Sequence, residues 1–259
     1  MHRRVDAAFV VDTTGSMGGF INSAKRQMEK MLERLQSAAD VDVRCVLIDY
    51  RDHPPQDNSY PAKLQTGKDP VTPKRFLATL NRLGLGSGGD AAESVLDGLD
   101  MLSEVRWRDH SRRIAFLVGD APAHGYFDHI HRGHDSWPEG CPCGRTAESV
   151  TANLEECGIV LYGVVVSRDQ HAKRCFEEFC GYTGGTIVAG ASGMSEIESY
   201  LKAEFGQLEF DKQVLDAVTG DPDWSVHTIA SSLGKQEGEV GRSIRRLLSR
   251  DLVPVPAEA

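Results

Sequence analysis

An aspartate and two hydroxyl side chains alternate just after an apolar segment near the start of the chain. The stretch reads Asp12-Thr13-Thr14-Gly15-Ser16, so a ligand-type oxygen stands at every second position. Hard oxygen ligands on a short turn suit Mg²⁺ or Mn²⁺. Thr and Ser before a helix can instead cap free backbone N–H groups. Asp12 favours the metal interpretation, because an unpartnered carboxylate at the end of a buried strand is energetically costly.

Two further carboxylates stand at the ends of other segments. Asp90 closes the glycine-rich run Gly86-Ser-Gly-Gly-Asp90, and Asp120 follows an apolar run that ends at Val118. Asp90 could also cap a helix, and Asp120 could be an ordinary turn aspartate. A parallel sheet would bring such positions to one edge, where three carboxylates and two hydroxyls call for a cation. The predicted metal ligands are Asp12, Thr14, Ser16, Asp90 and Asp120.

A second group of ligand-type side chains lies in a long polar stretch that ends near Arg145 and has no helical or strand period. Its members are His124, His129, His131, His134, Cys141 and Cys143. Zinc favours His and Cys ligands, but Cys-Pro-Cys is an unusual spacing for a zinc site. A loop of this length in a compact domain is usually functional. A zinc site and an interaction loop above the sheet edge therefore both stay open.

The segments that must position these side chains alternate between short β-rich runs and longer helical ones. Strands are expected over residues 5–11, 41–48, 113–118, 159–166 and 186–188, and helices over 20–35, 72–83, 91–102, 146–157, 170–182 and 195–205. This alternation predicts an α/β fold, a Rossmann-like doubly wound and mainly parallel sheet with helices on both faces. In such sheets the binding crevice lies beyond the carboxyl ends of the strands.

The last fifty residues no longer alternate between strand and helix patterns. Short helices are expected over 210–218, 228–234 and 237–249, with a turn at 221–223 and a strand over 252–255. This is the pattern of a helix-turn-helix. We therefore expect two domains, an α/β domain over residues 1–207 and a winged-helix-like domain over 208–259.

The helix over 237–249 carries basic side chains largely off its apolar face. Arg242, Arg245 and Arg246 are candidate contacts to a partner or to DNA, since basic recognition helices have this pattern. The segment from Glu209 to the end nevertheless holds more acidic than basic residues. Protein contact is therefore favoured over specific DNA binding.

Overall composition narrows the class of function. The chain has 259 residues, with 29 Lys and Arg against 38 Asp and Glu, which gives a formal net charge of −9. This balance argues against a general binder of nucleic acid or anionic membranes. No apolar run approaches the ~18 residues that a membrane span needs, and the first twelve residues resemble a strand rather than a signal peptide. The six cysteines lack the spacing of a disulfide framework, so we expect a cytoplasmic protein with reduced thiols.

Several of these motifs together resemble the von Willebrand factor A-type domain, over roughly residues 5–205. The pattern Asp12-x-Thr14-x-Ser16, a glycine-rich loop and a later Asp120 is similar to that family's metal-ion-dependent adhesion site. The runs Asp12-Thr-Thr-Gly-Ser-Met17, Tyr50-Arg-Asp-His53, Gly88-Gly-Asp90-x-x-Glu93 and Asp120-Ala-Pro-x-His124-Gly125 are similar to the A-type domains found beside alpha-kinases, although no kinase domain fits in this chain.

The resemblance implies a non-catalytic module that binds partner proteins through Mg²⁺, whose open coordination position can accept a partner carboxylate. Many family members carry Thr where this chain has Asp90. The extra carboxylate makes the site net negative, so it holds a cation more firmly but attracts an acidic partner group less. Family-level analogy places such adaptors beside AAA+ ATPases, kinases or bacterial conflict systems.

Two alternatives remain for the function. The turn after the first strand also resembles the aspartyl-phosphate motif of haloacid-dehalogenase-like phosphatases, in which Asp12 would be the nucleophile. That family needs a flap between the first strand and the first helix, whereas a helical pattern begins here within a few residues of Met17. The second alternative is a DNA-binding regulator that uses the helix-turn-helix. We favour a metal-dependent protein-interaction module that is not an enzyme.

Overall fold

The computed structural model describes residues 3–37, 41–189 and 193–253 of the chain. Its centre is a six-stranded sheet with the order β3-β2-β1-β4-β5-β6. The strands are β1 (Arg4–Asp12), β2 (Asp42–Tyr50), β3 (Ala62–Leu64), β4 (Arg112–Gly119), β5 (Ile159–Val165) and β6 (Ile187–Ala189). All neighbours pair in parallel except β3, which lies antiparallel to β2 at one edge.

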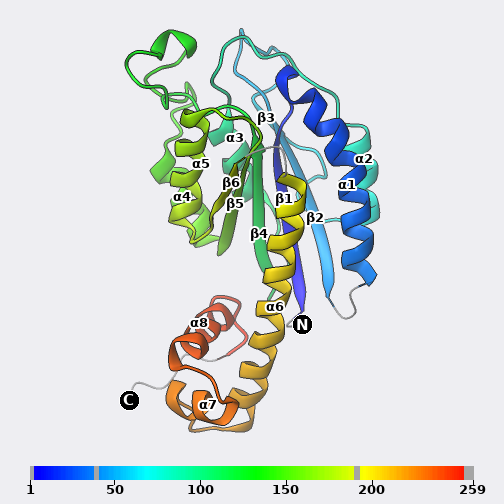
Figure 1. The fold of residues 1–259 in the computed structure, drawn as a ribbon, viewed down its shortest axis with the longest axis vertical. Helices are drawn as coiled ribbons and strands as arrows, with labels where there is room; N and C mark the ends of the chain where they lie inside the picture. Colours follow the sequence, from blue (N-terminus) through cyan, green and yellow to red (C-terminus); the bar gives the residue numbers. More distant parts are fainter. Residues whose placement is uncertain (1–2, 38–40, 190–192, 254–259) are drawn as a thin grey trace.

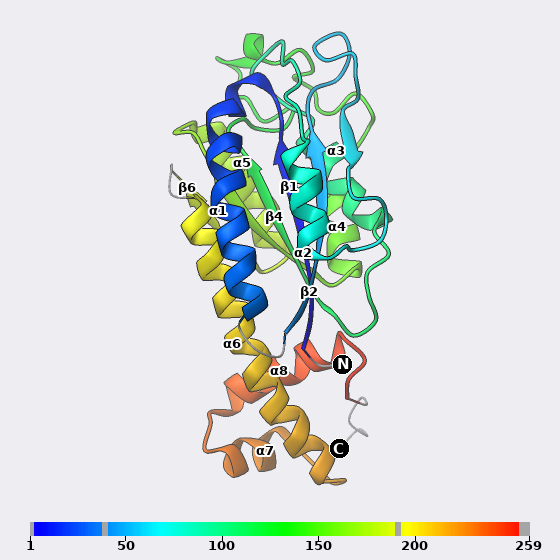
Figure 2. The same ribbon diagram turned by 90° about the vertical axis from the view of Figure 1, so that its right-hand side faces the viewer.

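Helices cover both faces of the sheet (Figures 1 and 2). On one face lie α1 (Gly18–Ser37), α2 (Pro73–Asn81) and the first part of α6 (Gly193–Gly220). On the other lie α3 (Val95–Asp100), α4 (Ala147–Glu156) and α5 (Gln170–Tyr182). Short 3₁₀ turns span Gly15–Met17, Met101–Glu104 and Arg132–His134. The expected doubly wound, mainly parallel α/β fold is confirmed.

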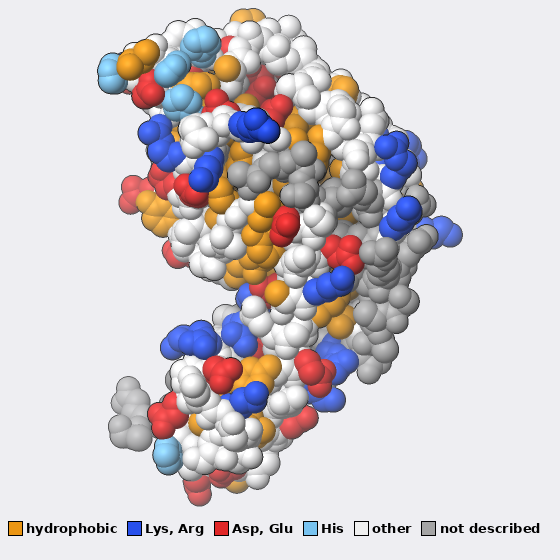
Figure 3. Space-filling view, in the orientation of Figure 1, with side chains coloured by type: hydrophobic (Ala, Val, Ile, Leu, Met, Phe, Trp, Pro, Cys, Tyr) orange, Lys and Arg blue, Asp and Glu red, His pale blue; other side chains and the backbone are white. Residues whose placement is uncertain are grey.

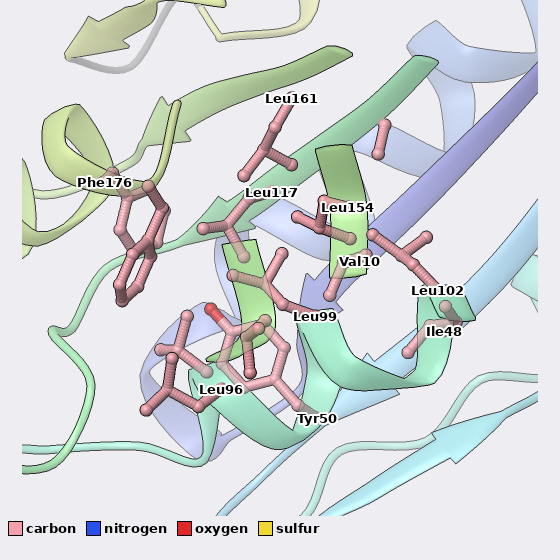
Figure 4. Close-up of a cluster of buried hydrophobic side chains, with 14 of the residues drawn as sticks. Val10, Ile48, Tyr50, Leu96, Leu99, Leu102, Leu117, Leu154, Leu161 and Phe176 are labelled. Carbon is pink, nitrogen blue, oxygen red and sulfur yellow. The ribbon is translucent and has the colours of Figure 1, made fainter. Parts of the chain in front are cut away.

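Successive residues of the central strands enter two separate cores, because side chains alternate between the faces of a strand. Phe9 packs with α1 and α2 on one face, whereas Val10 packs with α3 on the other. Figure 4 shows the second core, in which Val10, Ile48 and Leu117 from the sheet meet helix residues such as Leu99 and Leu154. Burial on both faces explains the near-continuous apolar runs of these strands.

The helix expected over 91–102 begins only at Val95, and its last positions form a 3₁₀ turn. The preceding residues are not helical and are bonded to the loop that follows β4. Ala91 N donates to His134 O at 2.9 Å, and Glu93 N donates to Pro122 O at 2.9 Å. Asp90 is therefore not a helix cap but part of a segment held against that loop. The short edge strand β3 has no apolar period and was not expected.

Helix α6 is one continuous helix, where the sequence had suggested two, over 195–205 and 210–218. Gly206 lies inside it, and a single glycine costs a helix only about 1 kcal/mol. Leu208 is buried beside the sheet and Val214 is buried in a third core, so one helix serves both parts of the molecule. The expected boundary between residues 207 and 208 falls inside this helix.

The third core joins the end of α6 to α7 (Val226–Leu233) and α8 (Glu237–Leu248). Helix α7 begins at a Ser225 capping box and ends at Gly234, whose φ of 63° is the left-handed conformation that favours glycine. The strand expected over 252–255 is not present at Leu252 and Val253, and its last two positions lie outside the described residues. Among the helices that the structure describes, none is both long and apolar enough to cross a membrane.

Candidate metal centre

The turn after β1 gathers the first three predicted ligands. Asp12 is fully buried at the end of the strand, and its Oδ1 accepts hydrogen bonds from Thr14 N at 2.8 Å and Thr14 Oγ1 at 2.7 Å. The Thr14 hydroxyl lies 3.3 Å from Ser16 Oγ. The 3₁₀ turn that starts at Gly15 leads directly into α1. The alternating sequence thus places one carboxylate and two hydroxyls side by side.

Around this turn, carboxylate oxygens are buried without any hydrogen-bond partner among the described residues. They are Oδ2 of Asp12, Oδ2 of Asp52, Oδ1 of Asp90, Oε2 of Glu93 and Oδ1 of Asp120. Asp120 follows β4, the neighbour of β1, and Asp52 follows β2, its other neighbour. A buried carboxylate oxygen without a partner is costly, and one cation can satisfy several of them at once.

Mutual repulsion marks these carboxylates as one cluster. Burial and the neighbouring Asp120 raise the pKa of Asp12 to about 7. Burial and the charges of the surrounding aspartates raise the pKa of Glu93 to about 11. Burial likewise raises the pKa of Asp90. A divalent cation would reverse this repulsion and hold the carboxylates ionised.

The cluster opens into a cavity of about 430 Å³. Ser16, Asp90, Glu93 and Asp120 line its inner side. Phe127, His131, His134 and His171 line the rim, and Figure 3 shows histidine side chains gathered at this end of the molecule. The site is therefore reachable from outside.

The glycine-rich run packs closely against the turn after β1. Gly86 N donates to Thr13 O at 2.8 Å. A Cβ on Gly86 would lie 2.5 Å from both Arg51 Cδ and Asp57 Oδ2, and one on Gly88 would lie 3.0 Å from Glu93 Oε1. Real Cβ contacts are rarely this short, so the run needs glycine to approach the site.

A buried histidine, His124, contacts one aspartate of the carboxylate cluster. His124 Nε2 lies 3.0 Å from Asp52 Oδ1, and His124 Nδ1 lies 2.8 Å from Asp135 Oδ1. Burial by itself would lower the pKa of His124, but its hydrogen bonds to Asp135 and Asp52 raise it to about 9. His124 is thus a protonated bridge whose charge offsets part of the negative cluster.

The six histidines and cysteines considered for zinc do not form one site. His124 bridges two aspartates, His129 is exposed, and His131 and His134 line the cavity rim. Cys141 and Cys143 lie elsewhere, beside a histidine and an aspartate from other segments. Spacing along a loop does not indicate which distant residues meet it, and the six residues divide among separate places in the described structure.

Sequence reasoning overlooked Asp52 and Glu93 as members of the cluster. Asp52 stands two residues beyond Tyr50, the last residue of β2, so the rule that picked out Asp120 also applies to it. Glu93 lies within the motif that starts at Gly88, where it had been matched to a family pattern without a role. The non-helical conformation of residues 91–93, which the sequence did not reveal, and the isolated β-bridge between Glu93 and Ala123 direct it to the site.

The three arginines of α8 do not form one free basic surface. Arg246 makes an ion pair with buried Asp211 of α6 at 2.5 Å. All three arginines line a hollow between α8 and the sheet, together with Arg112 of β4, but no ion pair to an acidic side chain is found for Arg242 and Arg245 among the described residues. Arg246 is therefore engaged within the molecule, whereas Arg242 and Arg245 remain candidates for contact.

Comparisons with known proteins agree with this arrangement. Residues 7–128 match the family model of the von Willebrand factor A domain. Over 159 residues the chain is 30% identical to alpha-protein kinase vwkA of Dictyostelium discoideum; the aligned part covers 61% of this chain and 24% of that kinase. The chain thus spans about a quarter of the length of the curated relative it matches.

Solved structures share the fold. Proximal thread matrix protein 1 of the mussel byssus, with a zinc-occupied MIDAS motif, superposes with a TM-score of 0.50 at 15% identity, covering 76% of this chain and 44% of that one. Another crystal form of the same protein gives a TM-score of 0.49 at 14% identity over the same shares of both chains. The α/β part of this chain thus has a fold like that of von Willebrand factor A-type domains, and its sequence is similar to theirs.

Proposed function

We propose that the chain is a Mg²⁺-dependent protein-interaction module that acts as an adaptor in a multi-protein complex in the cytoplasm. The observation that carries this proposal is the set of unpartnered, buried carboxylate oxygens beside an open cavity. Asp12, Thr14, Ser16, Asp90 and Asp120 are the proposed ligands, directly or through water. All six cysteines are free, which suits a reducing compartment.

Some residues of the site would bind the cation, and others would contact the partner protein. Asp12 and Thr14, held rigidly on the turn after β1, would fix the cation, and it would supply an open coordination position for an oxygen of the partner. Phe127 and the rim histidines offer apolar and hydrogen-bonding contact around that position. Like Asp90, the carboxylates of Asp52 and Glu93 make the site more negative. A partner carboxylate is therefore attracted less strongly than at a neutral site.

Affinity capture from the native host tests this function. The immobilised chain should retain partner proteins in Mg²⁺ and release them in EDTA, and Asp12→Asn should not retain them, because it weakens the cation site. Mass spectrometry identifies the retained proteins. Equal retention by both variants, with or without the metal, would contradict a metal-dependent module.

The two alternatives receive less support. In the phosphatase alternative a flap must follow the first strand, but here β1 ends at Asp12 and the next 3₁₀ turn starts at Gly15. We therefore propose no enzymatic activity for Asp12.

The DNA-binding alternative has a direct test that leaves the packing of α8 intact. We expect no shift of duplex DNA at ~0.15 M salt, because the cationic side chains available on α8 can neutralise few phosphates. Tight binding that Arg242→Glu combined with Arg245→Glu removes would make the chain a DNA-binding protein. Arg246 is left unchanged, since it holds Asp211.

A further inference from the structure

Four side chains with zinc-ligand chemistry meet at a second place, outside the carboxylate cluster. His53 follows β2, Asp97 lies on α3, and Cys141 and Cys143 lie in the loop before α4. One ligand atom from each lies within 4.8 Å of the other three. His53, Asp97 and Cys141 are buried, whereas Cys143 is exposed.

Two of the three distances between the buried ligand atoms match those around a tetrahedral zinc ion, and the third is shorter. Zinc bonds of ~2.0–2.3 Å place neighbouring ligand atoms roughly 3.3–3.8 Å apart. Here Cys141 Sγ lies 3.5 Å from His53 Nε2 and 3.3 Å from Asp97 Oδ2, and the last two atoms lie 3.0 Å apart. The Sγ atom of exposed Cys143 completes the group within 4.8 Å of the other ligand atoms, and it also lies 3.9 Å from the second ring nitrogen of His53, Nδ1.

The residues around the group hold its carboxylate in place. Arg145 Nη1 donates to Asp97 Oδ1 at 2.7 Å, and Arg145 Nε donates to Asp100 Oδ2 at 2.8 Å. Asp97 Oδ2 is left to face the thiols and the imidazole. Second contacts of this kind orient metal ligands, and the guanidinium offsets the net negative charge of Zn²⁺ bound by two thiolates and a carboxylate.

We propose that His53, Asp97, Cys141 and Cys143 form a structural zinc site. Soft thiolate ligands select zinc over Mg²⁺, so this site and the carboxylate cluster would take different metals. The ion would tie the loop between β4 and α4 to α3 and to the end of β2. That loop also carries Asp135, which bridges to His124, and two of the rim histidines, His131 and His134. Zinc would therefore order the wall of the metal centre proposed above.

Zinc content of the full chain tests the site. Reduced protein incubated with Zn²⁺ and excess Mg²⁺, then dialysed, should retain about one zinc ion per chain by elemental analysis. Cys143→Ser and Asp97→Asn should lower the retained zinc to near zero. The matched control Cys157→Ser should retain it, because Cys157 is a half-buried cysteine outside the group. Asp12→Asn should also retain it, which separates this site from the carboxylate cluster.

Cobalt provides the second readout. Co²⁺ bound to the reduced wild-type chain should give thiolate-to-metal absorption bands that Cys143→Ser weakens or removes. Retained zinc that is equal in wild type and Cys143→Ser would overturn the proposal. So would a Cys141–Cys143 disulfide that persists after treatment with reductant and leaves no thiol for the metal. Loss of zinc from the Cys157→Ser control would likewise overturn the assignment of these ligands.

Discussion

Millimolar Mg²⁺ or Mn²⁺ is expected to raise the melting temperature of the chain by roughly 5–10 °C, and Asp12→Asn should lose this shift. A ligand at a hundred times its dissociation constant stabilises the native state by about 2.7 kcal/mol. In a protein of this size, 1 kcal/mol shifts the melting temperature by about 2–4 °C. The stabilisation arises because the cation replaces repulsion among buried carboxylates by attraction.

The variants for this measurement replace a carboxylate by an amide side chain of nearly the same shape. Asn at position 12 keeps an oxygen that can accept the Thr14 hydrogen bonds but removes the charge that binds the cation. Asp120→Asn should behave similarly. Asp69→Asn is the control, because Asp69 is exposed and pairs only with Arg106 at the surface in the described structure. Melting curves unchanged by both metals in the wild type would rule out the proposed site.

The metal effect should also grow with pH. The pKa of Asp12 is raised to about 7 in the metal-free folded state, above its ordinary value of 3.8. Between these values the unfolded chain has lost the proton that the folded chain retains, so metal-free stability falls as the pH rises from ~4 to ~7. Metal binding must displace that proton below pH 7. The rise in melting temperature on adding Mn²⁺ should therefore be larger at pH 8 than at pH 6.

Parallel topology explains why much of the site was predictable. Asp12 and Asp120 each stand at the end of an apolar run, and a parallel sheet brings such positions to the same edge whatever their distance in sequence. The meeting of Asp12, Thr14 and Ser16 follows from two-residue spacing on one turn. Whether these residues bind a cation stays a prediction for the melting experiment.

Contacts made by irregular segments were not predictable in the same way. Glu93 reaches the site because the chain before α3 is not helical and Glu93 N is bonded to Pro122 O. His53 and Asp97 meet the two loop cysteines through the packing of three separate segments. Such segments have no periodic sequence pattern. The residue types therefore show that metal-ligand side chains are present, but not which of them lie together in the fold. The continuity of α6 was not predicted for a related reason, since it depends on buried residues in two separate cores, on both sides of Gly206.

The second large effect concerns an ion pair that joins α8 to α6. Asp211 is 2% exposed, and it accepts hydrogen bonds from Ser243 Oγ at 2.7 Å and from Arg246 Nε at 3.1 Å and Nη2 at 2.5 Å. The Arg246 guanidinium therefore meets the carboxylate through two nitrogens. Such paired contacts are geometrically specific, and removal of Arg246 would leave the buried carboxylate with only the more distant Arg250, whose Nη1 lies 3.9 Å from Asp211 Oδ2.

Arg246→Ala is expected to destabilise the C-terminal helices by roughly 3 kcal/mol, because Asp211 would lose its main counter-charge. Amide hydrogen exchange in α7 and α8 should accelerate on the order of a hundredfold, since these helices share a core with the end of α6. The adjacent Arg245→Ala is the matched control. Arg245 is exposed, and its truncation should change stability by less than about 0.5 kcal/mol.

A comparison of the two neighbouring alanine variants separates structure from binding on this helix. If Arg246→Ala and Arg245→Ala exchange at the same rate as the wild type, the Asp211 pair does not hold α8 to α6, and Arg246 is then free to contact a partner. If only Arg246→Ala accelerates exchange, any loss of partner or DNA binding in that variant reflects the loss of α8 packing. Contact residues on α8 must then be sought at Arg242 and Arg245, which line the hollow beside Arg112.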